Sequence, residues 1–322
     1  MCVTCGCSDE GQATLTNPET GQVETIVAMS AHASHEHTHL LPNGTVVTHS
    51  HTEHSHHSDH SAHTHTHHSH HRSRNGHSPD RPSHKGHATA HATAHSAAEA
   101  HARVHHTTLT LEQNILAKND LIAAQNRGWF KGRNILALNL VSSPGSGKTT
   151  LLTRTIQDLQ AEVPISVIEG DQATAHDADR IRETGCPVVQ INTGTGCHLE
   201  AAMVERGLQT LNPPLNSIVM IENVGNLVCP ALFDLGEHAK VVILSVTEGE
   251  DKPIKYPHMF RASEVMVLTK TDLLPYVNFK VDRCLEYARQ VNPSIQIFQV
   301  SATTGEGLEL WYGWLKEFGS KR

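Results

Sequence analysis

The chain has 322 residues, a net charge of −8 and 28 histidines, while Phe, Trp and Tyr together make up only 4%. This charge argues against a general nucleic-acid-binding protein, which normally carries a basic patch. The sequence has neither an apolar run long enough to span a bilayer nor a secretory signal. We therefore expect a cytoplasmic protein without membrane or nucleic-acid partners. There, its seven cysteines are expected to be metal ligands or thiols rather than disulfides.

The chain begins with MCVTCGC, which places Cys2, Cys5 and Cys7 close to the N-terminus. A structural zinc site normally takes four Cys or His ligands from two separated pairs. Here three thiolates and the terminal amine could form a compact planar set instead, which suits Ni²⁺ better. We therefore predict a nickel-binding motif within residues 1–30. Which amine takes part depends on whether Met1 is retained.

Residues 31–107 form a low-complexity zone that holds 24 of the 28 histidines, from His32 to His106. This zone has few large apolar residues to offset the entropy cost of ordering, so it is predicted to be disordered. Neutral imidazoles bind Ni²⁺ and Zn²⁺ well. The zone is therefore either a metal-binding region or only a solvated linker.

Residues 108–322 are predicted to be globular. They begin with a helix, because the apolar residues of TLEQNILAKNDLIAAQNRGWF recur at helical spacing. Short apolar runs then alternate with amphipathic stretches, and we predict strands at 135–141, 164–168, 188–191, 217–221, 241–246, 265–268 and 295–300. Continuous apolar strands that alternate with helices indicate a doubly wound α/β domain with a mostly parallel sheet.

The first predicted strand leads into NLVSSPGSGKTTLL, which has the features of a Walker A loop. Such a loop wraps phosphates with backbone N–H groups, while its lysine reaches the β- and γ-phosphates and its hydroxyl binds Mg²⁺. The pattern departs from the usual one at Ser142, where a glycine is common. The predicted nucleotide-binding residues of the loop are Gly145, Ser146, Gly147, Lys148, Thr149 and Thr150.

Two later segments predict which base is bound. The segment TKTD, with Lys270 and Asp272, resembles the N-K-x-D element of GTPases with Thr in place of Asn. A carboxylate at Asp272 would accept hydrogen bonds from guanine, whereas adenine has no matching pair of donors. Ser301 and Ala302, after another predicted strand, resemble the element that contacts guanine O6. Taken alone, TKTD could equally be a charged surface segment.

Two acidic residues at strand ends are candidates for catalysis together with Lys148. Asp171 in VIEGDQ and Glu222 in IVMIENVG would lie near the phosphate loop. One would hold Mg²⁺ and the other could orient the attacking water, but the sequence does not assign these roles. None of the motifs supplies an arginine finger, so we expect slow turnover.

A second candidate metal site combines three residues. Cys197 and His198 are adjacent in NTGTGCHLEA, and Cys229 follows Glu222 in ENVGNLVCP. Thiolate and imidazole are suitable ligands for Zn²⁺ or Ni²⁺. A buried cysteine is more often only a small apolar residue. The sequence does not establish whether Cys229 approaches the other two.

These motifs together resemble the HypB family, the nickel-inserting GTPases of [NiFe]-hydrogenase maturation. The resemblance covers residues 1–30 and 108–322 and includes MCxxCGC, VIEGDQ, TGxGCHLE, IENVGNLVCP and TEGEDKPxKYP. The related urease GTPase UreG differs at ENVGNLVCP, so a urease-type role is the weaker alternative. A nickel or zinc storage protein with a regulatory GTPase is another alternative.

The resemblance implies a P-loop NTPase of the SIMIBI type that forms a homodimer linked to nucleotide and metal. It implies nickel delivery to the hydrogenase large subunit with HypA and, in some members, SlyD. It also implies a tight nickel site at Cys2, Cys5 and Cys7. A weaker zinc or nickel site is implied at Cys197, His198 and Cys229.

Overall fold

A computed structural model describes residues 13–17, 20–26, 35–40, 46–51, 113–172 and 176–320. The chain divides into two compact units, one formed by Met1–Ala28 with Thr108–Arg322 and the other by Met29–Thr107. The predicted nickel ligands Cys2, Cys5 and Cys7 lie outside the described residues.

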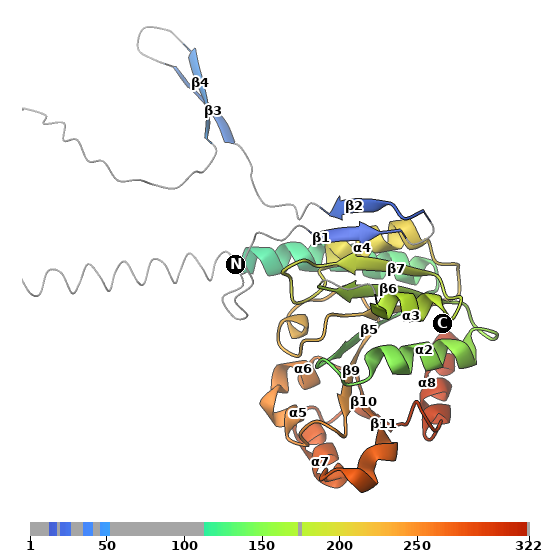
Figure 1. The fold of residues 1–322 in the computed structure, drawn as a ribbon. Coiled ribbons are helices and arrows are strands. Elements are labelled where there is room, and N and C mark those ends of the chain that lie inside the picture. The colour runs from blue at the N-terminus through green and yellow to red at the C-terminus, as the bar shows by residue number, and fades with distance from the viewer. Residues whose placement is uncertain are drawn as a thin grey trace, which may run out of the picture. The chain divides into compact units, whose positions relative to one another are not determined.

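A nine-stranded sheet is the centre of the first unit (Figure 1). All seven predicted strands are present, as β5 (Leu136–Ser142), β6 (Ile165–Asp171), β7 (Val188–Asn192), β8 (Ile218–Glu222), β9 (Ala239–Ser245), β10 (Val265–Thr269) and β11 (Gln296–Gln299). They are parallel neighbours in the order β11-β10-β9-β5-β8-β6-β7. The predicted α/β fold with a mostly parallel sheet is thereby confirmed.

Two further strands extend this sheet and were not predicted. β1 (Ala13–Thr16) pairs antiparallel with β7, and β2 (Val23–Ile26) pairs antiparallel with β1. Ala13, Leu15 and Ile26 are buried in the core formed with β7 and its neighbours. Part of the zone at residues 1–30 therefore belongs to the edge of the main sheet.

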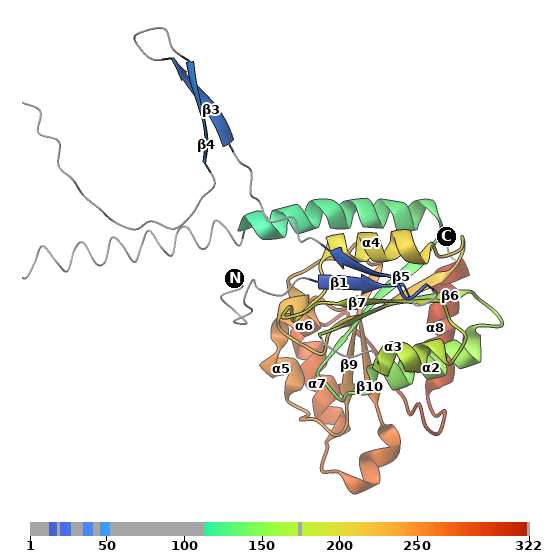
Figure 2. The same ribbon diagram turned by 45° about the horizontal axis from the view of Figure 1, so that its top comes forward.

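Helices cover both faces of the sheet (Figures 1 and 2). The described helices are 113–132, α2 (Lys148–Leu159), α3 (His176–Arg182), α4 (Ala201–Leu211), α5 (Lys252–Lys255), α6 (Pro257–Arg261), α7 (Val281–Val291) and α8 (Leu308–Ser320), with the 3₁₀ helices η1 (Cys229–Ala231) and η2 (Thr271–Tyr276). Side chains of α2, α3 and α8 share one core with the sheet. Helix 113–132 and α4 pack on the opposite face, as do α6 and α7. The result is a three-layer α/β arrangement.

The second unit contains an antiparallel hairpin of β3 (His35–Leu40) and β4 (Val46–His51). The prediction for the His-rich zone did not include this hairpin. Histidine alternates with Glu, Thr and Leu along β3 and with Ser at the end of β4, and such alternation is compatible with a strand. The rest of the zone lies outside the described residues.

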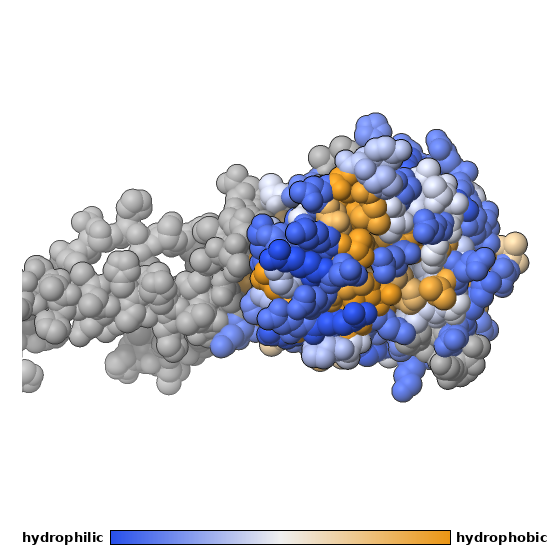
Figure 3. All heavy atoms as spheres, turned by 90° about the horizontal axis from the view of Figure 1, so that it is seen from below, coloured by the Kyte–Doolittle hydropathy of each residue, from blue (hydrophilic) through white to orange (hydrophobic). Residues whose placement is uncertain are grey.

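The surface of the first unit is partly apolar. A band of hydrophobic residues lies between hydrophilic ones on the face shown in Figure 3. Among the described residues, no helix has the length and apolar character needed to cross a bilayer.

Candidate nucleotide and metal sites

The phosphate loop connects the end of β5 to the start of α2. Gly145 has φ 74° and Gly147 has φ 95°, and both values fall in the left-handed region that favours glycine. Lys148 is the first residue of α2, so the loop wraps around a helix N-terminus, where anions bind well. At the variant position, the Ser142 hydroxyl donates to the Ser143 carbonyl at 2.7 Å. Ser142 therefore ends β5 without the positive φ that would require a glycine.

A cavity of about 420 Å³ lies over this loop, which is large enough for a small-molecule ligand. The predicted residues Asp171, Glu222 and Lys270 all line it, together with the whole predicted loop. The full lining is Pro144, Gly145, Ser146, Gly147, Lys148, Thr149, Thr150, Glu169, Gly170, Asp171, Gln172, Asp177, Arg180, Glu222, Asn223, Val224, Gly225 and Lys270.

Glu222 lies at the end of β8, directly against the start of α2. The Thr149 hydroxyl donates to Glu222 Oε1 at 2.7 Å, and Lys148 Nζ lies 3.9 Å from the same oxygen. The other oxygen, Oε2, is buried and accepts no hydrogen bond. A hydroxyl beside a carboxylate with an unsatisfied oxygen is a donor set that Mg²⁺ accepts. Burial raises the pKa of Glu222, and a bound cation would favour its ionised form.

Glu169 is a cavity residue that the sequence reasoning missed. It is the register partner of Glu222 across the β6–β8 pair and is only 2% exposed. Burial raises its pKa to about 9, with smaller contributions from Glu222 and Asp171. Strand alternation places Glu169 on the same side of β6 as Asp171. The alternation of residues along VIEGD could have indicated that Glu169 faces the same side of the strand as Asp171.

Arg180 is a second missed cavity residue, and the motifs gave no sign of it. It lies on α3, where its Nη2 donates to the Thr150 hydroxyl at 3.3 Å and its Nη1 lies 3.5 Å from Asp177. A guanidinium is therefore present beside the phosphate loop, although no arginine finger was expected.

Thr269 and Lys270, from the predicted guanine-recognition segment, contact the phosphate loop. Thr269, which replaces the usual Asn, donates from its hydroxyl to the Ser146 carbonyl at 2.6 Å. Lys270 Nζ donates to the Gly145 carbonyl at 2.7 Å. Both residues therefore hold the phosphate loop directly.

Asp272, Ser301 and Ala302 come together beyond Lys270 and do not line the cavity itself. The Ser301 hydroxyl donates to Asp272 Oδ1 at 2.6 Å, which joins the two segments. Arg154 Nη1 of α2 donates to the Ala302 carbonyl at 3.0 Å. The two predicted base-binding elements are therefore adjacent, although 28 residues separate Asp272 from Ser301 and Ala302 in the sequence.

Cys197, His198 and Cys229 form one cluster, which answers the question that the sequence left open. Their ligand atoms all lie within 4.8 Å of one another, and Cys197 Sγ is 3.6 Å from His198 Nδ1. Cys229 starts η1 and is buried, whereas Cys197 is partly exposed. The cluster provides two sulfurs and one nitrogen, a donor set suited to Zn²⁺ or Ni²⁺.

His198 is prepared to act as a ligand. Burial lowers its pKa to about 4, so the imidazole is neutral at physiological pH. Its Nε2 is buried without a hydrogen bond, and its ring lies 4.0 Å from the Phe233 ring between centroids. The side chains of the histidine tract are outside this description, as is the motif at Cys2, Cys5 and Cys7.

Comparison with known proteins places this chain in a family. Residues 136–299 match the CobW/HypB/UreG nucleotide-binding domain. The chain is 60% identical over 208 residues to hydrogenase maturation factor HypB of Azotobacter vinelandii, covering 65% of this chain and 69% of that protein. It is 59% identical over 208 residues to HypB of Escherichia coli K12, covering 65% and 72%.

Two solved structures also resemble it. The crystal structure of HypB from Archaeoglobus fulgidus matches with a TM-score of 0.59 and 37% identity, covering 63% of this chain and 99% of that chain. HypB from Helicobacter pylori in complex with nickel matches with a TM-score of 0.59 and 38% identity, covering 63% and 96%. With its phosphate loop and this similarity, the chain belongs to the HypB family of hydrogenase maturation factors, which has the P-loop NTPase fold.

Proposed function

We propose that this protein is a slow, Mg²⁺-dependent GTPase and a cytoplasmic nickel metallochaperone. It would store nickel and deliver it to the large subunit of [NiFe]-hydrogenase. One observation carries this proposal. Glu222 lines the phosphate cavity, and Cys229, seven residues later in the sequence, belongs to the Cys–His–Cys cluster. A single short segment therefore belongs to both sites.

Residues in and around the cavity would have different roles in GTP binding and hydrolysis. Lys148 and the backbone N–H groups of the loop would bind the β- and γ-phosphates. Thr149 and Glu222 would hold Mg²⁺, which neutralises the charge that develops on the phosphates. Asp171, at the end of β6, would orient the attacking water. Lys270, Asp272, Ser301 and Ala302 would recognise guanine.

Hydrolysis by purified protein tests the nucleotide part. We expect Mg²⁺-dependent release of phosphate from GTP, and we expect Lys148→Ala to abolish it, because Lys148 is the cation of the phosphate loop. Lys316→Ala is the matched control, since Lys316 pairs with Glu162 at the surface, away from the cavity. Equal hydrolysis of ATP and GTP would contradict the assignment of Asp272 to guanine.

Metal titration tests the two cysteine sites separately. Nickel and zinc are titrated into the full chain and into Cys2→Ala and Cys197→Ala variants, with and without GTP. We expect each variant to lose one class of site, and Cys186→Ala, which alters a buried thiol outside the cluster, to lose none. Unchanged stoichiometry and affinity in both test variants would rule out both sites.

Several partners belong to this proposal. Homodimer formation is supported by Val228 and Leu232, which flank η1 and are 39% and 48% exposed although both are apolar. The same proposal includes HypA, the hydrogenase large subunit and SlyD as partners. Each would be tested by co-purification with the full chain at defined nickel levels.

Metal storage is a second candidate function, supported by the 24 histidines between His32 and His106. Deletion of residues 31–107 distinguishes storage from insertion. If hydrogenase activity fails only when nickel is scarce, the tract stores metal. Failure at every nickel level would assign the tract to insertion itself.

A further inference from the structure

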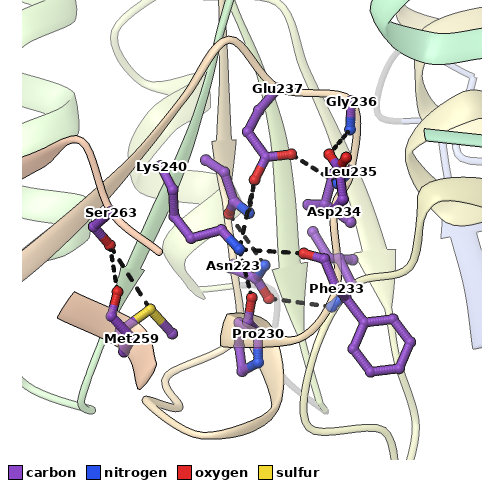
Figure 4. Close-up of polar contacts among 12 residues, drawn as sticks. Asn223, Pro230, Phe233, Asp234, Leu235, Gly236, Glu237, Lys240, Met259 and Ser263 are labelled. Carbon is purple, nitrogen blue, oxygen red and sulfur yellow. Dashed lines mark hydrogen bonds and ion pairs between the residues drawn. The ribbon is translucent and has the colours of Figure 1, made fainter. Parts of the chain in front are cut away.

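A buried ion pair of Lys240 and Glu237 lies close to Pro230 and Phe233 (Figure 4). Lys240, on β9, is 6% exposed, and its Nζ lies 3.7 Å from Oε1 of Glu237, which is 8% exposed. Lysine and glutamate are rarely buried to this extent. An ion pair in such a place adds little stability compared with apolar residues of similar size, because both charges lose their hydration. Its presence therefore calls for another explanation.

One end of the pair holds the loop that carries Cys229. Lys240 Nζ donates to the Pro230 carbonyl at 2.8 Å and to the Phe233 carbonyl at 3.3 Å. Pro230 directly follows Cys229, and the Phe233 ring lies against His198. The Glu237 carboxylate, at 3.7 Å, is an ion-pair partner rather than a third hydrogen-bond acceptor. The ammonium group therefore fixes the backbone within η1 and just after it.

The other end of the pair reaches the loop that carries His198. Glu237 Oε1 accepts from Asn139 Nδ2 at 3.0 Å, and Asn139 Oδ1 accepts from Asn223 Nδ2 at 3.1 Å. Asn223 Oδ1 accepts from the Leu199 N–H at 3.1 Å. Leu199 directly follows His198. Asn139 and Asn223 are 0% and 2% exposed, so the whole connection is shielded from water.

We propose that Lys240, Glu237, Asn139 and Asn223 form a buried polar chain that positions the ligands of the metal cluster. The chain spans β9, β5 and the segment after β8, which are neighbours in the sheet, and it holds both loops that supply ligands. Its members act as positioning residues: they orient Cys197, His198 and Cys229 without binding the metal. This inference rests on the proposed metal site at those three residues.

Cobalt binding tests the proposal in the full-length chain with Cys2, Cys5 and Cys7 replaced by serine. In this parent protein the thiolate-to-cobalt absorption band should report only the Cys197–Cys229 cluster, and a Cys197→Ala variant of it should lose the band. The test variant is Glu237→Gln with Lys240→Met, which removes both charges and leaves neither one buried alone. We expect cobalt affinity to fall about 10- to 100-fold and the d–d bands to shift.

Thr155→Val is the matched control, because it removes the buried hydrogen bond from Trp311 Nε1 at 3.1 Å in the core on the opposite face of the sheet. It should lower thermal stability yet leave cobalt affinity and spectrum unchanged. The proposal would be overturned if the double variant kept the cobalt affinity and spectrum of the parent. It would also be overturned if Thr155→Val weakened cobalt binding as much as the double variant does. Absence of the thiolate band in the parent would instead refute the metal site itself, together with this inference.

Discussion

Arg180 gives the cavity a cationic group that the motifs did not indicate. Its guanidinium contacts Thr150, next to the residue that would hold Mg²⁺, so it would lie near the charge that develops in the proposed phosphoryl transfer. We therefore expect Arg180→Ala to lower kcat for GTP about 100-fold. Steady-state phosphate release is the measurement. Arg182→Ala is the control, since Arg182 lies on the same helix but pairs with Asp179 outside the cavity. Equal effects of the two variants would exclude a specific role for Arg180.

Glu169 makes the stability of the ligand-free protein depend on pH. Its pKa of about 9 in the folded state exceeds the ordinary glutamate value, so the folded protein binds more protons than the unfolded chain between about pH 4.5 and 9. The free energy of unfolding should therefore decrease as pH rises through this window, by about 1 kcal/mol per unit from this group.

Denaturation with urea at pH 6 and pH 8 measures the effect. Glu169→Gln should be more stable than wild type at pH 8 and should show a smaller loss between the two values. Some loss should persist, because burial also raises the pKa of Glu222. The same pH dependence in Glu169→Gln and wild type would show that Glu169 ionises normally.

At the scale of single residues, the sequence predicted contacts within one motif and placed Asp171 and Glu222 near the phosphate loop, but it left other contacts between distant segments open. Lys148 and Thr149 belong to one contiguous motif, so their roles could be predicted from the sequence. Cys229 meets His198 only after separate strands have assembled into the sheet. The role of Asn139 could not be predicted for another reason. It is a single polar residue within an apolar strand, and no neighbouring residue indicates its hydrogen-bond partners.

At the scale of elements, β1 fastens the N-terminal segment to the sheet. Leu15 is 3% exposed and lies in the core beside Ile191, its register partner on β7. We expect Leu15→Ala to lower the free energy of unfolding by about 2–4 kcal/mol, because it leaves a cavity in that core. Chemical denaturation measures this change. Val23→Ala on β2, where Val23 is 64% exposed, should cost less than about 0.5 kcal/mol. A negligible cost for Leu15→Ala would show that β1 does not hold the edge.

The elements themselves were predicted with unequal success for physical reasons. Strands β5, β6, β8, β9 and β10 are buried along almost their whole length, because helices cover both faces of a parallel sheet. β1 and β2 have only four residues each, contain Thr and Glu, and depend on β7 for pairing. Such short strands have no pattern that separates them from a polar loop, so only the assembled sheet edge identifies them.

At the scale of the whole molecule, β1 limits how far Cys7 can lie from the sheet. Thr14 pairs antiparallel with Asn192, so Ala13 lies at the end of β7 that continues toward Cys197. Six peptide units join Cys7 to Ala13, a reach of roughly 20 Å at most. Linkers this short give effective concentrations of about millimolar.

Nickel should therefore move between the two proposed sites within one chain. When one equivalent is added to wild-type protein, the redistribution toward the tighter cysteine motif should proceed at a rate that does not depend on protein concentration. Stopped-flow absorbance of the nickel–thiolate bands follows it. In an equimolar mixture of Cys2→Ala and Cys197→Ala chains, the same redistribution must occur between chains, so at concentrations below those at which the proposed homodimer forms its rate should rise with concentration. A similar concentration dependence in both samples would mean that β1 does not bring the motif within reach of the cluster, and that nickel passes between chains instead.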